Sequence, residues 1–132
     1  MANRQRKTIY SDIPISLIAH PITGDVAMLE NENAVKQSVK NIVLTNFYER
    51  PYSPYFGGDV ISQLFENATP LTEFTVRKNI QTALRNYETR ANVHDIIVKS
   101  NPDENGLAAT IIFSVKGSRE PITLNVLLER IR

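Results

Sequence analysis

Two carboxylates accompany the aromatic segment FYERPYSPYFGG: Glu49 lies near its start, and Asp59 follows its last residue. Paired acidic side chains beside aromatic rings suit glycoside hydrolysis, in which one carboxyl group protonates the leaving oxygen and the other attacks or activates water. The acid must stay protonated, and an apolar setting achieves this by raising its pKa. Arg50 follows Glu49 directly, and a neighbouring positive charge favours the ionised carboxylate instead. We therefore predict no catalytic residues, with lysozyme-like glycoside hydrolysis as the alternative.

The residue types that hold metals or cofactors are scarce in this chain. Histidine occurs only at His20 and His94, and cysteine is absent. No HxxxH or CxxC spacing gathers ligands, and a histidine beside Ile96 and Val98 is more typical of packing at a strand edge. The sequence also lacks the GxSxG turn of a nucleophilic serine and the glycine-rich loops that bind phosphates. We predict no metal, no cofactor and no small-molecule substrate.

The charge balance argues against nucleic acid and membranes as partners. Fifteen Lys and Arg residues oppose fourteen Asp and Glu residues, which leaves a net charge of +1. Stacking on nucleic acid needs aromatic rings interleaved with basic groups, and the aromatic segment holds Arg50 alone. No apolar run approaches the roughly 20 residues that span a bilayer, and the amino terminus MANRQRKTIY lacks the apolar centre of a signal peptide. With cysteine absent, these features predict a protein of a reducing cytoplasm.

The aromatic segment is better explained as a folded loop with a surface for another protein. Two prolines and a glycine pair interrupt any regular element there. We expect Phe47 and Phe56 to pack inward and some of the tyrosines to face outward, because Tyr and Arg are enriched at protein interfaces. The residues predicted to form this structural loop and its partner contact are Glu49, Arg50, Tyr52, Tyr55, Phe56 and Gly57.

Apolar residues at helical spacing predict three helices that position this loop. Asn33 is the expected N-cap of the first helix, and Asp59 is that of a short second one. The pair Thr69-Pro70 supplies a cap and a first-turn proline for a longer helix that ends near Arg90. Ahead of the helices, residues 13–30 are expected to form short strands or a hairpin.

After the last helix the apolar period becomes two, which predicts three strands. Short connections between them favour an antiparallel meander. Each element has one apolar face, so the helices should cover one face of the sheet. The predicted fold is α+β, with one compact domain at 13–132 after a flexible polar arm at 1–12. The expected core-facing strand residues are His94, Ile96 and Val98, then Leu107, Ala109, Ile111, Phe113 and Val115, then Ile122, Leu124, Val126 and Leu128.

Two motifs in the chain resemble those of a known family. The first motif comprises Leu44-Thr45, Glu49-Arg50, Pro54, Phe56-Gly57 and Leu64-Phe65-Glu66, and the second is the helix end TALRNYETR, with Tyr87, Glu88 and Arg90. Over about residues 15–130 the chain resembles the sheath-initiator baseplate wedge proteins of T4-like contractile phages, which have relatives in type VI secretion baseplates. The sequence departs from the family at Tyr48, where the family has Gly, and at Thr89, where it has Pro. Glycine permits backbone angles that tyrosine does not.

The resemblance implies a structural component of a tail baseplate and not an enzyme. It implies that Tyr87, Glu88 and Arg90 dock on a helical core bundle formed by other baseplate wedge proteins. An arginine suits such docking because its guanidinium can bind a partner carboxylate through two hydrogen bonds. The alternative is an ordinary solvated ion pair, which contributes at most about 1 kcal/mol to stability.

The resemblance also implies contact with the tail sheath protein. It implies that the chain templates the first sheath ring by strand addition, in which backbone hydrogen bonds bind the added strand and alternate side chains set its register. The candidate strands are 107–116 and 122–131, whose alternative role is structural, with Arg130 and Arg132 protecting an edge. The implied location is the virion tail baseplate, with host cytoplasm during assembly, although the composition alone also fits an interaction module of an unrelated cytoplasmic complex. The residues predicted for strand addition are Leu107, Ile111, Phe113, Ile122, Leu124, Val126 and Leu128.

Overall fold

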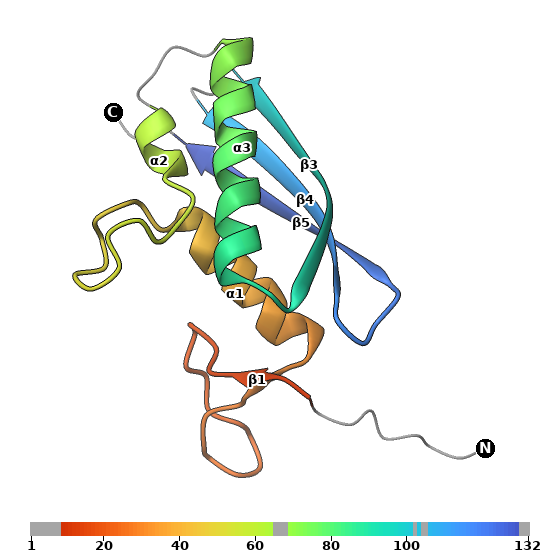
Figure 1. The fold of residues 1–132 in the computed structure, drawn as a ribbon. Helices are drawn as coiled ribbons and strands as arrows, with labels where there is room; N and C mark the ends of the chain where they lie inside the picture. The colour runs from red at the N-terminus through yellow and green to blue at the C-terminus, as the bar shows by residue number, and fades with distance from the viewer. Residues whose placement is uncertain (1–8, 65–68, 102, 104–105, 130–132) are drawn as a thin grey trace.

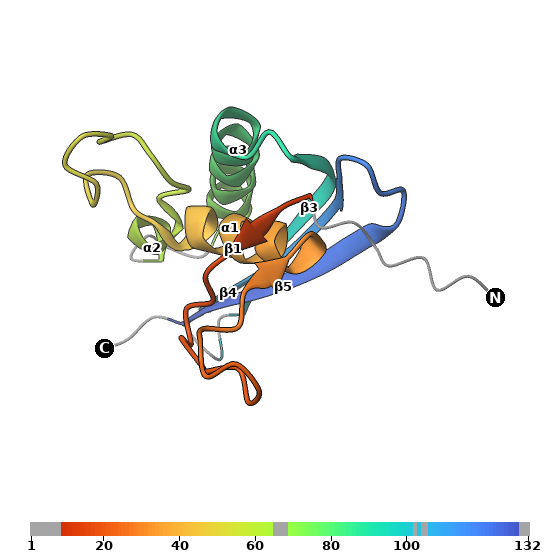
Figure 2. The same ribbon diagram turned by 90° about the horizontal axis from the view of Figure 1, so that it is seen from below.

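A three-stranded antiparallel sheet, with helices on one of its faces, forms the body of the protein (Figure 1). The computed structural model describes residues 9–64, 69–101, 103 and 106–129. A small sheet of two strands lies beside the first helix (Figure 2). This arrangement confirms the predicted α+β fold.

The first helix, α1 (Glu32–Leu44), forms because its apolar residues recur on the side that meets the core. Its start differs from the prediction, since the N-cap is Asn31 and not Asn33. The Asn31 side chain does not cap the helix, because its Oδ1 accepts hydrogen bonds from the backbone N–H groups of Ile9 (2.8 Å) and Tyr10 (3.3 Å). The helix start is therefore joined to the amino-terminal segment.

The long helix α3 (Pro70–Tyr87) begins as predicted. The Thr69 hydroxyl accepts a hydrogen bond from the Thr72 N–H at 3.3 Å, and Pro70 occupies the first turn. The helix ends at Tyr87 with Glu88 as its C-cap, slightly before the expected end near Arg90.

The short helix α2 (Val60–Gln63) begins where predicted, with Asp59 as its N-cap residue. Asp59 precedes it in a left-handed conformation, with φ +49°, and its side chain makes no capping hydrogen bond. The carboxylate instead accepts hydrogen bonds from the Phe47 N–H at 3.3 Å and the Ser62 hydroxyl at 2.8 Å. Asp59 therefore fastens the aromatic loop to α2.

The main sheet has the order β3-β4-β5, from β3 (Ala91–Asn101), β4 (Gly106–Val115) and β5 (Pro121–Glu129). On β4 and β5 the predicted core-facing residues are buried or partly buried. On β3 the prediction is wrong for His94, because a register shift between Val93 and Asp95 moves His94 out of the two-residue period. Val93 packs against the core instead, while His94 is exposed and its Nε2 lies 3.0 Å from the Ser114 hydroxyl oxygen.

The amino-terminal hairpin, residues 9–30, extends beyond the main sheet (Figure 1). Strands β1 (Ser11–Asp12) and β2 (Leu29–Glu30) pair in antiparallel fashion, and a bridge joins Ala19 to Val26 further out. The prediction of short strands or a hairpin is confirmed. β1 falls within the segment predicted as a flexible arm, and the rest of that arm before Ile9 lies outside the described residues.

The core lies between the sheet and helices α1 and α3. Among the residues that the structure describes, no helix is long and apolar enough to cross a membrane. The core residues with the largest fully buried side chains are Phe113, Ile80, Leu84, Ile111, Val35, Val39, Val43, Val60 and Val76.

Candidate partner-binding surface

The aromatic segment forms a closed loop, residues 46–58, whose two ends meet at the end of α1. The Gly58 N–H donates to the Ile42 carbonyl oxygen at 3.0 Å, and the Asp59 N–H donates to the Thr45 carbonyl oxygen at 3.2 Å. Across the loop, the Tyr48 N–H donates to the Pro54 carbonyl oxygen at 2.6 Å. The first two bonds fasten the end of the loop to backbone carbonyl groups at the end of α1, and the three together fix the loop as a compact Ω-type structure.

Tyr48 has a backbone conformation in this loop that glycine adopts more readily than tyrosine. Tyr48 adopts φ +67°, in the left-handed region that bulky residues rarely occupy. Its side chain is 72% exposed, so no core contact of the ring explains this conformation. The backbone bond to Pro54 and the closed loop therefore hold Tyr48 in a strained geometry.

Phe56 and the tyrosines divide between the inside and outside of the loop as expected, whereas Phe47 is half-buried and its ring centroid lies 6.3 Å from that of Tyr55 instead of packing on the core cluster. Phe56 packs against the core, and its ring centroid lies 4.6 Å from that of Tyr87. The Arg50 guanidinium carbon lies 3.9 Å from the Phe56 ring centroid, a distance suited to a cation–π contact. Tyr52 is 99% exposed and Tyr55 is 66% exposed. Phe56 thus anchors the loop and joins it to the end of α3.

Glu88 and Arg90 form a clamp immediately after α3. Arg90 Nε donates to Glu88 Oε1 at 2.8 Å, and Arg90 Nη2 donates to Glu88 Oε2 at 2.9 Å. The Glu88 side chain is 2% exposed, whereas that of Arg90 is 33% exposed. The pair is therefore not an ordinary solvated ion pair, and the Glu88 carboxylate does not face outward towards a docking partner. Its oxygens bind within the chain.

Burial and hydrogen bonding oppose each other at Glu88. Burial by itself raises the pKa of Glu88, but hydrogen bonds from Arg90 and Ser38, together with the Arg90 charge, hold it below the ordinary value of 4.5. The hydrogen bond to Glu88 also raises the pKa of Arg90. Both groups therefore stay charged at neutral pH, so Glu88 is unsuited to act as a protonated general acid.

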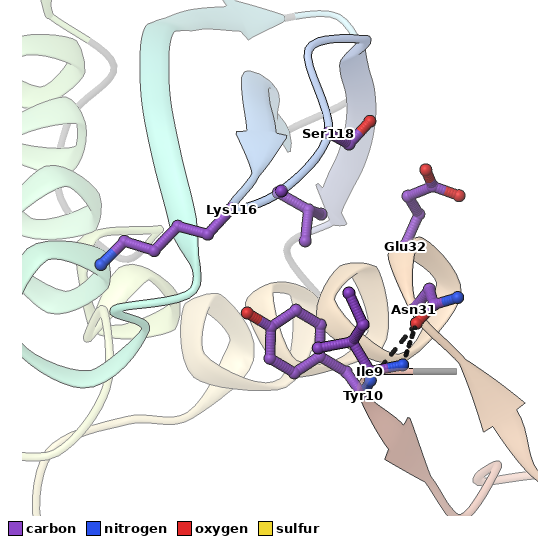
Figure 3. A pocket seen from close by; sticks show the side chains of 8 residues that line it. Ile9, Tyr10, Asn31, Glu32, Lys116 and Ser118 are labelled. Atoms are coloured by element: carbon purple, nitrogen blue, oxygen red, sulfur yellow. Dashed lines mark hydrogen bonds between the residues drawn. The ribbon is translucent and has the colours of Figure 1, made fainter. Parts of the chain in front are cut away.

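Arg90 connects the motif to distant segments. Its carbonyl oxygen accepts from the Lys116 N–H at 2.8 Å, and its guanidinium carbon lies 5.4 Å from the Tyr10 ring centroid. Tyr10 and Lys116 also line a shallow pocket with Ile9 and Asn31 (Figure 3). Sequence spacing gave no signal for Ser38, Tyr10 or Lys116, because these residues reach the motif only through tertiary folding.

The sheet has two edges, and β4 lies at neither of them. β4 pairs with β3 on one side and with β5 on the other, so its backbone has no free edge for strand addition. Of the residues predicted for that role, Leu107, Ile111 and Phe113 lie on β4 and are buried. Their side chains support the sheet from its centre, and β3 and β5 remain as edges.

Two side chains cover the edge of β3. The Ser100 N–H donates to Glu73 Oε1 at 2.8 Å, and the Ile96 N–H donates to Asp95 Oδ1 at 2.8 Å. The hydrogen bonds from Ser100 also lower the pKa of Glu73, which keeps that carboxylate charged. Alternate backbone groups on the outer side of β3 are therefore already occupied.

The outward backbone groups of β5 follow from this alternation. The backbone N–H groups of Ile96 and Ser100 point away from β4. Their partners on β4, Ile111 and Leu107, therefore direct their own backbone groups to β5. Ile111 and Leu107 pair with Leu124 and Leu128, whose backbone groups therefore face β4. The predicted residues Ile122, Leu124, Val126 and Leu128 thus bury their side chains and bind β4, while the outward groups belong to Thr123, Asn125 and Leu127.

The structure brings no recognisable hydrolytic pair together at the loop. Glu49 is exposed, Arg50 is directed to the Phe56 ring, and the Asp59 carboxylate is bound to Phe47 and Ser62. Within the described ranges, no group of three His, Cys, Asp or Glu side chains could hold a metal ion.

Comparisons with known proteins agree with this architecture. Residues 29–120 match the family model of the baseplate wedge protein gp25. The chain is 39% identical over 115 residues to the baseplate wedge protein gp25 of Enterobacteria phage T4, covering 87% of this chain and 85% of that protein. A putative tail lysozyme from Geobacter sulfurreducens has the same fold, with a TM-score of 0.69, 20% identity, and coverage of 80% of this chain and 98% of that chain. A chain of the anti-feeding prophage baseplate also shares the fold, with a TM-score of 0.62, 20% identity, and coverage of 91% and 85%. The protein belongs to the gp25 family of phage baseplate wedge proteins.

Proposed function

We propose that this chain is a structural adaptor that joins other baseplate wedge proteins to the first ring of tail sheath. The observation that carries the proposal is the Glu88–Arg90 clamp, in which a buried carboxylate holds a partly exposed guanidinium in a fixed orientation. A preorganised arginine loses less freedom on binding than a mobile one.

The docking surface on the wedge core bundle consists of Arg90, Tyr87 and the outer part of the aromatic loop. A guanidinium has five N–H donors, and two of those of Arg90 go to Glu88. The others serve a partner carboxylate or carbonyl group, while Glu88 positions Arg90 without touching the partner. Tyr87 is 42% exposed beside Phe56, and its hydroxyl donates to the Tyr55 carbonyl oxygen at 3.4 Å, which extends the surface onto the loop.

The sheath contact is strand addition at the outer edge of β5. The outward backbone groups of Thr123, Asn125 and Leu127 bind no other strand among the described residues, whereas side chains occupy alternate groups on β3. An added strand would continue the β3-β4-β5 ladder, and the buried side chains of β5 would fix its register.

The test of docking uses baseplates assembled without this protein. Wild type and a Glu88→Gln/Arg90→Gln variant are added, and retention after sedimentation is measured. The paired glutamines can keep a hydrogen bond between the two sites while removing both charges, so the variant should fold, which thermal unfolding checks. We expect wild type to be retained and the variant to be lost. Equal retention would contradict the docking site.

The test of sheath templating uses Asn125→Pro, with Asn125→Ala as the matched control. Both lose the side-chain bond from Thr110 to Asn125, which is 3.0 Å long. Only proline also removes an outward N–H, and an edge strand tolerates proline when that N–H faces away from its neighbour. We expect the proline variant to bind to baseplates but to initiate sheath assembly poorly. Normal sheath growth with the proline variant would rule out this edge.

The proposal includes no catalytic step. The alternative activity is lysozyme-like hydrolysis at Glu49, and a peptidoglycan-clearing assay compares wild type with Glu49→Gln. We expect neither protein to clear peptidoglycan. Clearing by wild type that is lost in the variant would establish the hydrolase instead.

A further inference from the structure

Exposed apolar side chains are concentrated on the amino-terminal hairpin. Seven of the fifteen large hydrophobic side chains that are exposed among the described residues lie in this one segment. Scattered apolar residues are normal on protein surfaces, whereas a concentration of them marks an interaction site. The seven are Ile9, Ile13, Ile15, Leu17, Ile18, Ile22 and Met28, with exposed fractions from 51% to 87%.

Polar contacts hold the hairpin in one shape although its apolar side chains face outward. Gln37 of α1 accepts from the Ile15 N–H at 3.1 Å and donates to the Ile13 carbonyl oxygen at 2.9 Å. Further out, the Ala27 N–H donates to the Ile18 carbonyl oxygen at 3.2 Å. The hairpin is therefore a preformed surface, which lowers the entropy lost on binding.

Leu17 shows backbone strain at this surface. It has φ +50°, while its side chain is 62% exposed. A leucine in the left-handed region is disfavoured, and such strain is characteristic of positions that serve a function. The turn bond from the Leu17 N–H to the Pro14 carbonyl oxygen, at 3.1 Å, holds the conformation.

The charges of the hairpin indicate what kind of partner it fits. Residues 9–30 contain Asp12, Asp25 and Glu30 but neither Lys nor Arg. Acidic groups oppose binding to anionic membranes and nucleic acid, and they attract a protein surface that carries basic side chains. At its base, Tyr10 lies beside Arg90, so the hairpin adjoins the docking surface proposed above.

We propose that the hairpin is a second docking surface, which binds an apolar surface bordered by Lys and Arg on another baseplate protein. This inference rests on the proposed function of the chain as a baseplate adaptor. The outer part of the hairpin, before Leu29, lies outside the segment that matches the family model. The surface is therefore additional to the two motifs by which the sequence resembles the family.

The test measures binding to purified wedge assemblies that lack this chain. The hairpin variant Ile18→Ser/Ile22→Ser removes two side chains that are 67% and 87% exposed, so it should fold. Leu71→Ser/Ile97→Ser is the matched control, because it removes two exposed aliphatic side chains from α3 and β3. We expect the hairpin variant to bind at least tenfold more weakly and the control to bind like wild type.

Three results would overturn the inference in distinguishable ways. If wild type and the hairpin variant bind equally, the hairpin is not a docking surface, although the adaptor function stands. If wild type does not bind, the adaptor function fails and the inference fails with it. If wild type binds phosphatidylserine vesicles or dimerises through Ile18 and Ile22, the occupant is a membrane or a second copy instead.

A second variant of this chain, Asp25→Asn/Glu30→Gln, tests whether the partner surface is bordered by Lys and Arg. Removing these charges should weaken binding at low salt and flatten its dependence on salt concentration. An unchanged salt dependence would show that the partner carries no such border.

Discussion

The carbonyl oxygen of Thr45 occupies the space that a side chain at Gly57 would need. Gly57 is buried and has φ +114°, so both its surroundings and its backbone require glycine. The closure of the aromatic loop on α1 depends on this close approach. The Phe56-Gly57 pair in the first motif therefore has a structural cause, independent of any partner.

Gly57→Ala should lower the free energy of unfolding by about 2–4 kcal/mol, because the new Cβ overlaps Thr45 and the backbone is strained. Gly24→Ala is the control, since Gly24 has φ +70° but no atom within 4 Å of a built Cβ. That change should cost only about 1 kcal/mol. Urea unfolding measures both, and equal losses would show that the overlap relaxes freely.

Tyr48→Gly should make the protein more stable than Tyr48→Ala by about 1 kcal/mol. Both variants lose the exposed ring and its contact with Tyr55, but only glycine relieves the left-handed backbone at φ +67°. Thermal unfolding of the two proteins gives the difference. If alanine proved as stable as glycine, the loop would not be strained at this residue.

Phe56→Ala should lower the free energy of unfolding by about 2–3 kcal/mol. The ring is partly buried, packs on the core and contacts Arg50 and Tyr87, so the cost falls below that of a fully buried phenylalanine. Tyr52→Ala removes a ring that is 99% exposed and should leave stability nearly unchanged. An unaltered melting curve for Phe56→Ala would refute the anchoring role.

Glu88 should contribute to the acid sensitivity of the fold. Its pKa in the folded protein is below 4.5, so its contribution is present above that pH and is lost as the pH falls towards the folded value. Glu88→Gln should therefore flatten the loss of stability in acid. Glu73→Gln is a useful comparison, because that pKa is also lowered but the Ser100 contacts lie nearer the surface, so the flattening should be smaller. Urea unfolding between about pH 3 and pH 7 is the measurement.

Arg90→Ala should lower the free energy of unfolding by more than Glu88→Gln does. It leaves the buried Glu88 carboxylate without its main hydrogen-bond donor, which costs about 3 kcal/mol, and it should raise the pKa of Glu88. Arg90→Lys keeps the charge but loses the two-bond geometry, so its loss of stability should lie between those of Arg90→Ala and Glu88→Gln. A loss below about 1 kcal/mol for Arg90→Ala would indicate a surface ion pair instead.

The sequence predicts a structural feature correctly where the groups that determine it lie close together in the chain. Thr69 and Pro70 start α3 because the hydroxyl and the N–H that it accepts from belong to the same turn. The alternation on β4 and β5 likewise identifies their buried faces, because neighbouring residues in a strand point to opposite sides. The resemblance of the two motifs to the gp25 family is confirmed by comparison with known members.

Where a feature depends on a contact between residues far apart in sequence, local sequence patterns could not predict it. Asn31 replaces Asn33 at the start of α1 beside Ile9 and Tyr10, which lie more than 20 residues earlier. His94 leaves the predicted face because a bulge is a property of two paired strands.

The sequence by itself determined the α+β class, most of the secondary structure and the buried strand faces, because short-range spacing encodes them, and its two motifs indicated the family by resemblance. Only the tertiary structure decided that Glu88 is buried, that side chains occupy part of the β3 edge and that the hairpin exposes its aliphatic side chains. The physical reason is that burial is set by packing between distant segments. Apolar periodicity shows which face of an element prefers to be covered, but not which element covers it.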